Sequence, residues 1–259
     1  MDLGIKGRRA IVCASSKGLG RGCAMSLARE GVQVVINSRN GAELEATASD
    51  IRKATGAQVI AVAADVTTAE GRKTLLAACP DPDILVTNAG GPPPGDFHDW
   101  NEKEWMDALN NNMIAPIMLI KAVIDPMIAR KFGRIVNITS RSVRTPLFHL
   151  GLSNGARAGL TGFVAGLSRQ VARHNVIINN LLPGPFATDR QMSGVKREAE
   201  KLGVPIEDHL KKKQAEVPVG RFGTAEEFGD ACAYLCSKQA EFIVGQNLLM
   251  DGGMFAVTV

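Results

Sequence analysis

Residues 9–22 read RAIVCASSKGLGRG, a short apolar run that leads directly into a glycine-rich turn. A short run of consecutive apolar residues is typical of a strand buried on both faces. Gly18 and Gly20 suit a tight turn at the start of a helix, where the chain can approach a pyrophosphate and main-chain N–H groups face the anion. The stretch therefore predicts a strand, a turn and a helix with a phosphate-binding site between them.

The same alternation of apolar runs and longer helical patterns continues along the chain. Further apolar runs occupy 33–37, 58–64, 84–87, 134–139, 176–182 and 246–250. Runs that are apolar throughout fit parallel strands covered by helices on both faces. We therefore expect a single α/β domain over residues 1–259, with a doubly wound Rossmann fold and a mostly parallel, seven-stranded sheet between two helix layers. Ligands of such folds bind at the carboxyl ends of the strands.

Composition excludes several classes of protein. Of the 259 residues, 45% are apolar and 22% charged, which is ordinary for a soluble domain, and no apolar run approaches the roughly 18 residues of a membrane span. The N-terminus lacks the apolar segment of a secretory signal, so we expect a cytoplasmic protein with no membrane contact. Scattered basic residues with only 5% aromatics do not indicate nucleic-acid binding. The five cysteines lack metal-type spacing, so we expect reduced thiols and no metal site.

The end of the second apolar run indicates which dinucleotide would bind. A cofactor with a free ribose 2′-hydroxyl usually meets an acidic side chain here, but the sequence is Asn37-Ser38-Arg39. The guanidinium of Arg39 can fork onto a 2′-phosphate, and Lys17 supplies a second positive charge from the glycine-rich turn. The pair favours NADP(H) over NAD(H).

Several short motifs together resemble those of the short-chain dehydrogenase/reductase family, close to its 3-oxoacyl-acyl-carrier-protein reductases. CASSKGLG at 13–20 resembles the family's TGxxxGxG, with Cys13 and Ala14 in place of the Thr and the first Gly. DV at 65–66, NAG at 88–90, PG at 183–184 with Thr188 downstream, and GQNLLMDGG at 245–253 match family motifs in their order and spacing. The resemblance covers nearly the whole chain.

The resemblance implies a set of cofactor contacts. The pair at 65–66 would contact adenine, and the loop at 183–188 would frame the nicotinamide and its carboxamide. Together with the residues of the two turns, the expected contacts are Ala14, Ser15, Ser16, Lys17, Gly18, Leu19, Gly20, Ser38, Arg39, Asp65, Val66, Asn88, Ala89, Gly90, Arg157, Pro183, Gly184 and Thr188.

The resemblance also places the catalytic group, which in this family is Asn, Ser, Tyr and Lys. Asn112 takes the Asn position and Ser140 the Ser position. Ser153, thirteen residues after Ser140, stands where the tyrosine is expected, and Arg157, four residues further, stands in the lysine position. The only tyrosine, Tyr234, lies on a late helix with no evident route to this site. We therefore expect Asn112, Ser140, Ser153 and Arg157 to form the site.

Two functions remain open at this point. The first is an NADP(H)-dependent oxidoreductase that interconverts a carbonyl and an alcohol through an altered proton relay. Loss of a positioned general acid costs roughly 10²–10⁴ in rate. The proton would then come from Ser153, a water or His149. The second is a catalytically silent cofactor-binding protein with a sensing, regulatory or structural role.

Two segments suggest partners. Residues 190–216 follow the PG loop, where the family has its substrate lid; their basic, helix-forming composition favours acidic or carrier-bound substrates, although an exposed helical pair explains it as well. Arg141 and Arg144 would favour an anionic substrate if they are more than surface charges. Gly155, Gly159, Gly162 and Gly166 mark a small-residue helix face, and the resemblance implies a homodimer or homotetramer. Pro116, which cannot donate an N–H to the carbonyl of Asn112, marks either a water site or a packing kink.

Overall fold

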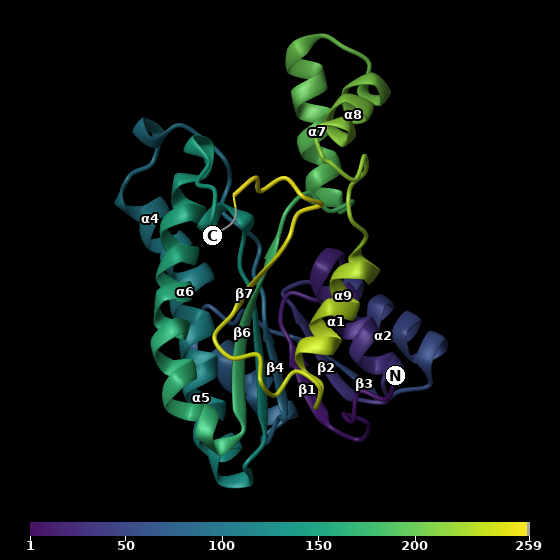
Figure 1. The fold of residues 1–259 in the computed structure, drawn as a ribbon, viewed down its shortest axis with the longest axis vertical. Coiled ribbons are helices and arrows are strands. Elements are labelled where there is room, and N and C mark those ends of the chain that lie inside the picture. Colours follow the sequence, from purple (N-terminus) through teal and green to yellow (C-terminus); the bar gives the residue numbers. More distant parts are fainter. Residues whose placement is uncertain (258–259) are drawn as a thin grey trace.

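A seven-stranded sheet forms the centre of the computed structural model, which describes residues 1–257 (Figure 1). All its pairings are parallel, in the order β3-β2-β1-β4-β5-β6-β7. The strands are β1 (Arg9–Val12), β2 (Gln33–Ser38), β3 (Val59–Ala63), β4 (Ile84–Thr87), β5 (Gly133–Ile138), β6 (Val176–Pro183) and β7 (Asn247–Met250). The predicted single-domain Rossmann fold is confirmed, with every strand parallel.

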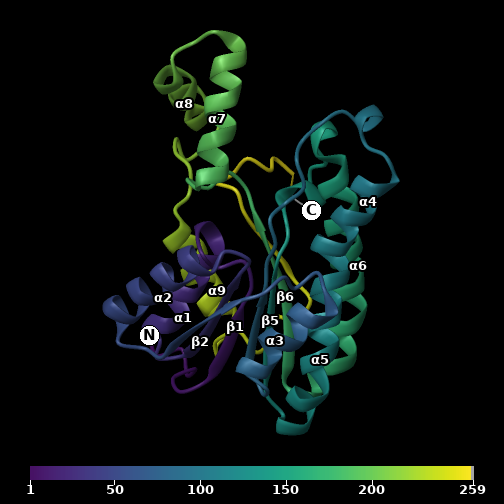
Figure 2. The same ribbon diagram turned by 180° about the vertical axis from the view of Figure 1, so that it is seen from behind.

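Helices cover both faces of the sheet (Figures 1 and 2). On one face lie α1 (Gly18–Arg29), α2 (Gly41–Thr55) and α9 (Ala225–Leu235), and on the other α3 (Ala69–Ala78), α5 (Ala115–Arg130) and α6 (Gly151–Val171). Consecutive residues in and just after β1 show why both faces are covered. Ala10 and Val12 belong to the apolar core on one face of the sheet, and Ile11 and Cys13 to the core on the other. A buried strand points alternate side chains to opposite faces, so each needs its own apolar layer.

Within the first helix layer, α1 and α9 pack unusually close to each other. A Cβ on Gly22 of α1 would lie 2.0 Å from the carbonyl oxygen of Ala225 in α9, and one on Gly229 would lie 2.3 Å from the carbonyl oxygen of Gly22. Only glycine permits this approach. The contact fixes α1, and with it the glycine-rich turn, against the C-terminal part of the domain.

The long helical stretch before β5 is not uniform. It consists of α4 (Glu102–Leu109), a π-helical turn (Asn110–Ile114) and α5. By length and composition alone the stretch Glu102–Arg130 is apolar enough to cross a membrane, because an 18-residue window within it has a mean hydropathy of 1.5. Its residues Leu119, Ile120, Val123 and Met127 are buried against the sheet, which accounts for its apolar character as that of a core helix.

Two helices stand above the carboxyl ends of the strands (Figure 1). They are α7 (Asp189–Leu202) and α8 (Ile206–Ala215), and their small apolar cluster includes Val195, Val217 and Phe222. His209 is buried between them and contacts Glu198, which also pairs with Lys213. The helical character predicted for 190–216 is confirmed; its role as a lid stays a prediction.

Candidate active site

Two adjoining cavities open at the carboxyl ends of the strands, as the fold predicts. The larger, about 740 Å³, lies beyond β2 and β3, and the smaller, about 580 Å³, lies beyond β5 and β6. Both are lined by Lys17 and by residues 88–91, so the turn after β1 and the loop after β4 join them. A ligand longer than either cavity can therefore lie across both.

The glycine-rich turn between the cavities presents a helix end without a side-chain cap. Gly18 has φ +57°, which glycine adopts without strain, and Ala14 has φ +45°, where a side chain is less favourable. The N-cap Lys17 makes no side-chain cap, and the first turn of α1 has no acidic residue. Because the first N–H groups of a helix have no partner within it, this end can bind an anion.

The larger cavity is lined by the residues expected for the adenosine half of a dinucleotide. Asn37 joins the ends of β2 and β3 at this cavity, since its Nδ2 donates to the carbonyls of Val62 and Ala64 at 2.9 and 3.0 Å. The lining includes Ala14, Ser16, Lys17, Ser38, Arg39, Asp65, Val66, Asn88, Ala89 and Gly90. Within residues 1–257, the guanidinium of Arg39 forms no ion pair.

An acidic residue that the sequence reasoning missed also lines this cavity. Glu43 accepts hydrogen bonds from the Ser16 hydroxyl at 2.9 Å and from the Lys17 ammonium at 3.2 Å. The bond from Ser16, followed by that from Lys17, lowers the pKa of Glu43 below its ordinary value. Its position could have been suspected, because the third residue of a helix that begins at the end of β2 points back toward the glycine-rich turn.

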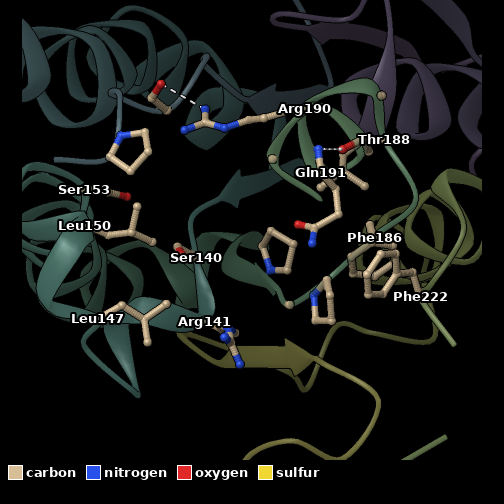
Figure 3. Close-up of a pocket in the computed structure, with 18 of the residues that line it drawn as sticks. Ser140, Arg141, Leu147, Leu150, Ser153, Phe186, Thr188, Arg190, Gln191 and Phe222 are labelled. Carbon is tan, nitrogen blue, oxygen red and sulfur yellow. Dashed lines mark hydrogen bonds between the residues drawn. The ribbon is translucent and has the colours of Figure 1, made fainter. Parts of the chain in front are cut away.

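The smaller cavity brings together three of the four expected catalytic residues, Ser140, Ser153 and Arg157 (Figure 3). Ser140 follows β5, and its Oγ accepts a bond from the N–H of Ser142 at 3.1 Å. The hydroxyl proton of Ser140 is therefore free to be donated elsewhere. Figure 3 shows Ser140 and Ser153 on one side of the cavity, with Thr188 and Phe186 across from them.

Arg157 is a buried cation with an electrically neutral partner. Its Nη1 donates to the carbonyl of Ile138 at the end of β5, at 2.7 Å, and it forms no ion pair among the described residues. Burial, with a smaller contribution from the positive charge of Arg190, lowers the pKa of Arg157 to about 10. The remaining guanidinium donors are available to a ligand in the cavity.

Asn112, the fourth expected residue, lies in the π-helical turn and lines the larger cavity. Its Nδ2 donates to the carbonyl of Ala108 at 3.2 Å, while its buried Oδ1 has no partner within residues 1–257. A buried acceptor without a partner is costly, which makes this oxygen a site for a water or a ligand group. The π turn accounts for the irregularity expected near Pro116.

A contact between segments far apart in the sequence lies at the edge of the cavities. Arg190, in the first turn of α7 and labelled in Figure 3, donates from Nη1 to the carbonyl of Gly91 at 2.9 Å and from Nη2 to that of Pro92 at 2.8 Å. A Cβ on Gly91 would lie 2.6 Å from Nη1 of Arg190, so glycine makes room for this contact. The start of α7 and the proline-rich loop after β4 therefore meet at the edge of the cavities, since Gly91 lines both and Arg190 lines the smaller one.

Most remaining expected residues line a cavity, and a few do not. Gly18, Leu19, Pro183, Gly184 and Thr188 line the smaller cavity. Ser15 and Gly20 line neither: the buried Ser15 hydroxyl donates to Val12 and accepts from the N–H of Asn37, and Gly20 lies against the carbonyl of Ala14.

Of the other polar residues that the sequence singled out, some line a cavity and some do not. His149 and Arg141 line the smaller cavity, whereas Arg144 and Tyr234 line neither. Within residues 1–257, no cluster of three His, Cys, Asp or Glu side chains could hold a metal.

Comparison with known proteins identifies the family. A family model described as enoyl-(acyl carrier protein) reductase matches residues 13–255. The chain is 32% identical to the 3-oxoacyl-[acyl-carrier-protein] reductase FabG of Escherichia coli, over 98% of this chain and 100% of that protein. It is 31% identical to the NADPH-dependent reductase BacG of Bacillus subtilis, over 95% of this chain and 97% of that protein.

The chain belongs to the short-chain dehydrogenase/reductase family. Its fold superposes on L-sorbose reductase from Gluconobacter frateurii, solved with NADPH and L-sorbose, with a TM-score of 0.94, 28% identity and full coverage of both chains. This short-chain dehydrogenase/reductase is thus an oxidoreductase by descent, related to proteins that interconvert carbonyls and alcohols with NAD(P)(H).

Proposed function

We propose that this short-chain dehydrogenase/reductase is an NADP(H)-dependent oxidoreductase that interconverts a carbonyl and an alcohol through an altered proton relay. The continuity of the two cavities supports this most directly, because the larger ends at Arg39 and the smaller contains Ser140, Ser153 and Arg157. A dinucleotide across both would bring its reactive ring to these side chains. Relatives named for NADPH support the cofactor.

The chain supplies groups that fit each part of the cofactor. The uncapped start of α1 suits the pyrophosphate, and Arg39 with Lys17 lies where a 2′-phosphate would be. Arg157 suits the hydroxyls of the nicotinamide ribose, and Gly184 with Thr188 would frame the ring. When bound, the cofactor supplies or accepts a hydride at the substrate carbon.

The side chains around the substrate would orient its oxygen and exchange its proton. Ser140 is the donor to this oxygen, since its Oγ already accepts the N–H of Ser142. Ser153 and Arg157 occupy the positions in which the family resemblance places a tyrosine and a lysine. Serine is a much weaker acid than tyrosine, and an arginine that remains charged cannot pass a proton on. The proton therefore comes from a water, with Ser153 and Asn112 as its partners, or from His149.

The smaller cavity favours a substrate with an acidic group. Arg141 follows Ser140 directly, and its contact in the described structure is the sulfur of Met254 at 3.4 Å, which leaves its charge uncompensated. Glu198 and Glu216 also line this cavity, and their carboxylates share an ion pair with Lys213. An anionic group beside the reacting carbonyl would meet Arg141, with residues 190–216 acting as the lid above it.

The altered pair also favours a second function. Ser153 and Arg157 are both nearly buried, and neither provides a matched acid at neutral pH. A protein that binds NADP(H) and signals its presence would keep the cavities and lose turnover. This alternative predicts cofactor binding of normal strength with no consumption of any carbonyl.

Cofactor oxidation by two proteins separates these functions. NADPH absorbance is followed with ketones, aldehydes, oxo acids and 3-oxoacyl thioesters, for the natural protein and for the Ser153→Tyr/Arg157→Lys double variant. Turnover by the natural protein supports the oxidoreductase, and Ser153→Ala and His149→Asn then identify the proton donor. Turnover by the double variant alone supports the silent binding protein. Absence of NADPH binding by calorimetry would overturn both.

A further inference from the structure

Glu43 lies in the part of the larger cavity that Arg39 and Lys17 were expected to make positive. It is the third residue of α2, whose N-cap Asn40 accepts the N–H of Glu43 at 3.3 Å. The cap fixes the first turn of α2 against the end of β2. The Glu43 side chain is thereby directed at the glycine-rich turn, where it accepts from Ser16 and Lys17.

This arrangement gives the two expected cations different surroundings. Lys17 is paired with Glu43, at 3.2 Å, whereas Arg39 forms no ion pair within residues 1–257, although its charge acts on the Asp65 carboxylate in the same cavity. A 2′-phosphate in the cavity would compete with Glu43 for the Lys17 ammonium and would be repelled by the Glu43 carboxylate. A free 2′-hydroxyl, by contrast, can donate to a carboxylate, which is the usual arrangement for a cofactor without the phosphate.

We propose that Glu43 is a specificity-determining residue that holds Lys17 and Ser16 away from the 2′-phosphate and thereby limits the preference of the protein for NADP(H) over NAD(H). This inference rests on the proposed cofactor role of the larger cavity. It assigns most of the attraction for the phosphate to Arg39, and it makes the contribution of Lys17 conditional on the charge of Glu43. The charge at position 43 then sets the ratio of the two affinities.

The charge can be removed with little change in shape. Glu43→Gln keeps a hydrogen-bonding group near Ser16 but no longer holds Lys17 by charge. We expect the dissociation constant of NADPH to fall about 1.5- to fivefold, the range for one exposed charge interaction, while that of NADH does not fall. Glu45→Gln is the matched control, since Glu45 lies on the same helix, pairs with Arg52 and lines neither cavity.

A second pair of variants tests the role of Lys17. Lys17→Met is made in the natural protein and in Glu43→Gln, and all dissociation constants are measured by calorimetry without substrate. We expect Lys17→Met to weaken NADPH binding more in the Glu43→Gln background, because Lys17 is then released toward the phosphate. Non-additivity of this kind measures the coupling between the two side chains.

The other outcomes contradict the inference. Equal effects of Glu43→Gln on NADPH and NADH would mean that Glu43 acts on the shared adenosine, and an unchanged ratio would mean that it does not act on selectivity. Additive effects of the two substitutions would remove the proposed competition for Lys17. If the natural protein binds neither dinucleotide, the proposed function itself is wrong, a result distinct from a changed or unchanged ratio.

Discussion

Arg190 and Gly91 are 99 positions apart in the sequence, and Nη1 of Arg190 donates to the carbonyl of Gly91 at 2.9 Å. With the second bond to Pro92, this contact joins the start of α7 to the loop after β4 across the two cavities. If residues 190–216 act as the predicted lid, two bonds from a charged donor are strong enough to hold it closed, yet few enough to break during binding and release.

Removal of this contact is expected to speed cofactor release. In Arg190→Met the start of α7 loses both bonds to the loop after β4, so we expect the dissociation rate of NADPH to rise by roughly tenfold, the effect of about 1.4 kcal/mol. Stopped-flow fluorescence of the bound dinucleotide measures the rate. Lys196→Met, an exposed position on the same helix, is the control; an unchanged rate in Arg190→Met would show that the contact does not retain the cofactor.

Replacement of Arg157 by an apolar residue is expected to stabilise the protein without cofactor and weaken cofactor binding. Burial lowers the pKa of Arg157 from its ordinary value to about 10, so folding carries a cost at every pH below about 10, and the cost declines as the pH rises further. We expect Arg157→Met to raise the free energy of unfolding by about 1–3 kcal/mol.

Urea denaturation without cofactor tests the expected gain in stability. The thermal shift caused by NADPH tests the expected loss of cofactor binding. Arg169→Met provides the control, because Arg169 lies exposed on the same helix and should change stability by less than about 0.5 kcal/mol. A less stable Arg157→Met protein would contradict the expectation and indicate that the bond to Ile138 outweighs the cost of the buried charge.

A buried polar chain across the sheet is expected to be needed for stability. Thr87 donates to Asn137 at 2.6 Å, Asn137 to Asn180 at 3.1 Å, and Asn180 to Asn247 at 2.8 Å, which links β4, β5, β6 and β7. Asn137→Leu would leave buried polar groups unpaired on both sides and should cost about 2–4 kcal/mol in urea denaturation.

The coupling within this chain provides the check. Thr87→Val should cost less in the Asn137→Leu background than in the natural protein, because its partner is already absent. Equal costs would show that the two side chains contribute independently and that the hydrogen bond between them is unimportant.

Two glycine substitutions in helices are expected to have opposite effects. Gly22→Ala places a Cβ 2.0 Å from the carbonyl oxygen of Ala225, so α1 and α9 must separate and stability should fall by about 1–3 kcal/mol or more. Gly162→Ala on α6 meets no atom within 4 Å and should stabilise the helix by about 0.5–1 kcal/mol.

Thermal unfolding and light scattering of both variants measure stability and mass. If Gly162→Ala instead destabilises the protein or lowers the molar mass of the particle in solution, either result would mean that another subunit covers this face of α6. That result would support the expected homodimer or homotetramer.

The sequence by itself determined the fold, because the information is local. Each strand is a short, mostly apolar run and each helix has its own period, so the order of elements and the parallel sheet followed from residues near one another in the chain. The ends of the strands also follow from the sequence, and the turn at Gly18 and the position of Ser140 could be placed there. Short motifs in the correct order then indicated the family.

Only the tertiary structure decided which charged and polar groups pair with one another. Glu43 and Lys17 are paired because the cap at Asn40 turns α2 toward the glycine-rich turn, and Arg190 reaches Gly91 because α7 begins at the carboxyl ends of the strands (Figure 1). Arg157 is buried and donates to a main-chain carbonyl, and this environment cannot be predicted from its being an arginine. Charge and hydrogen bonding depend on distances of a few ångströms between segments remote in sequence, and these distances are set by packing of the whole domain.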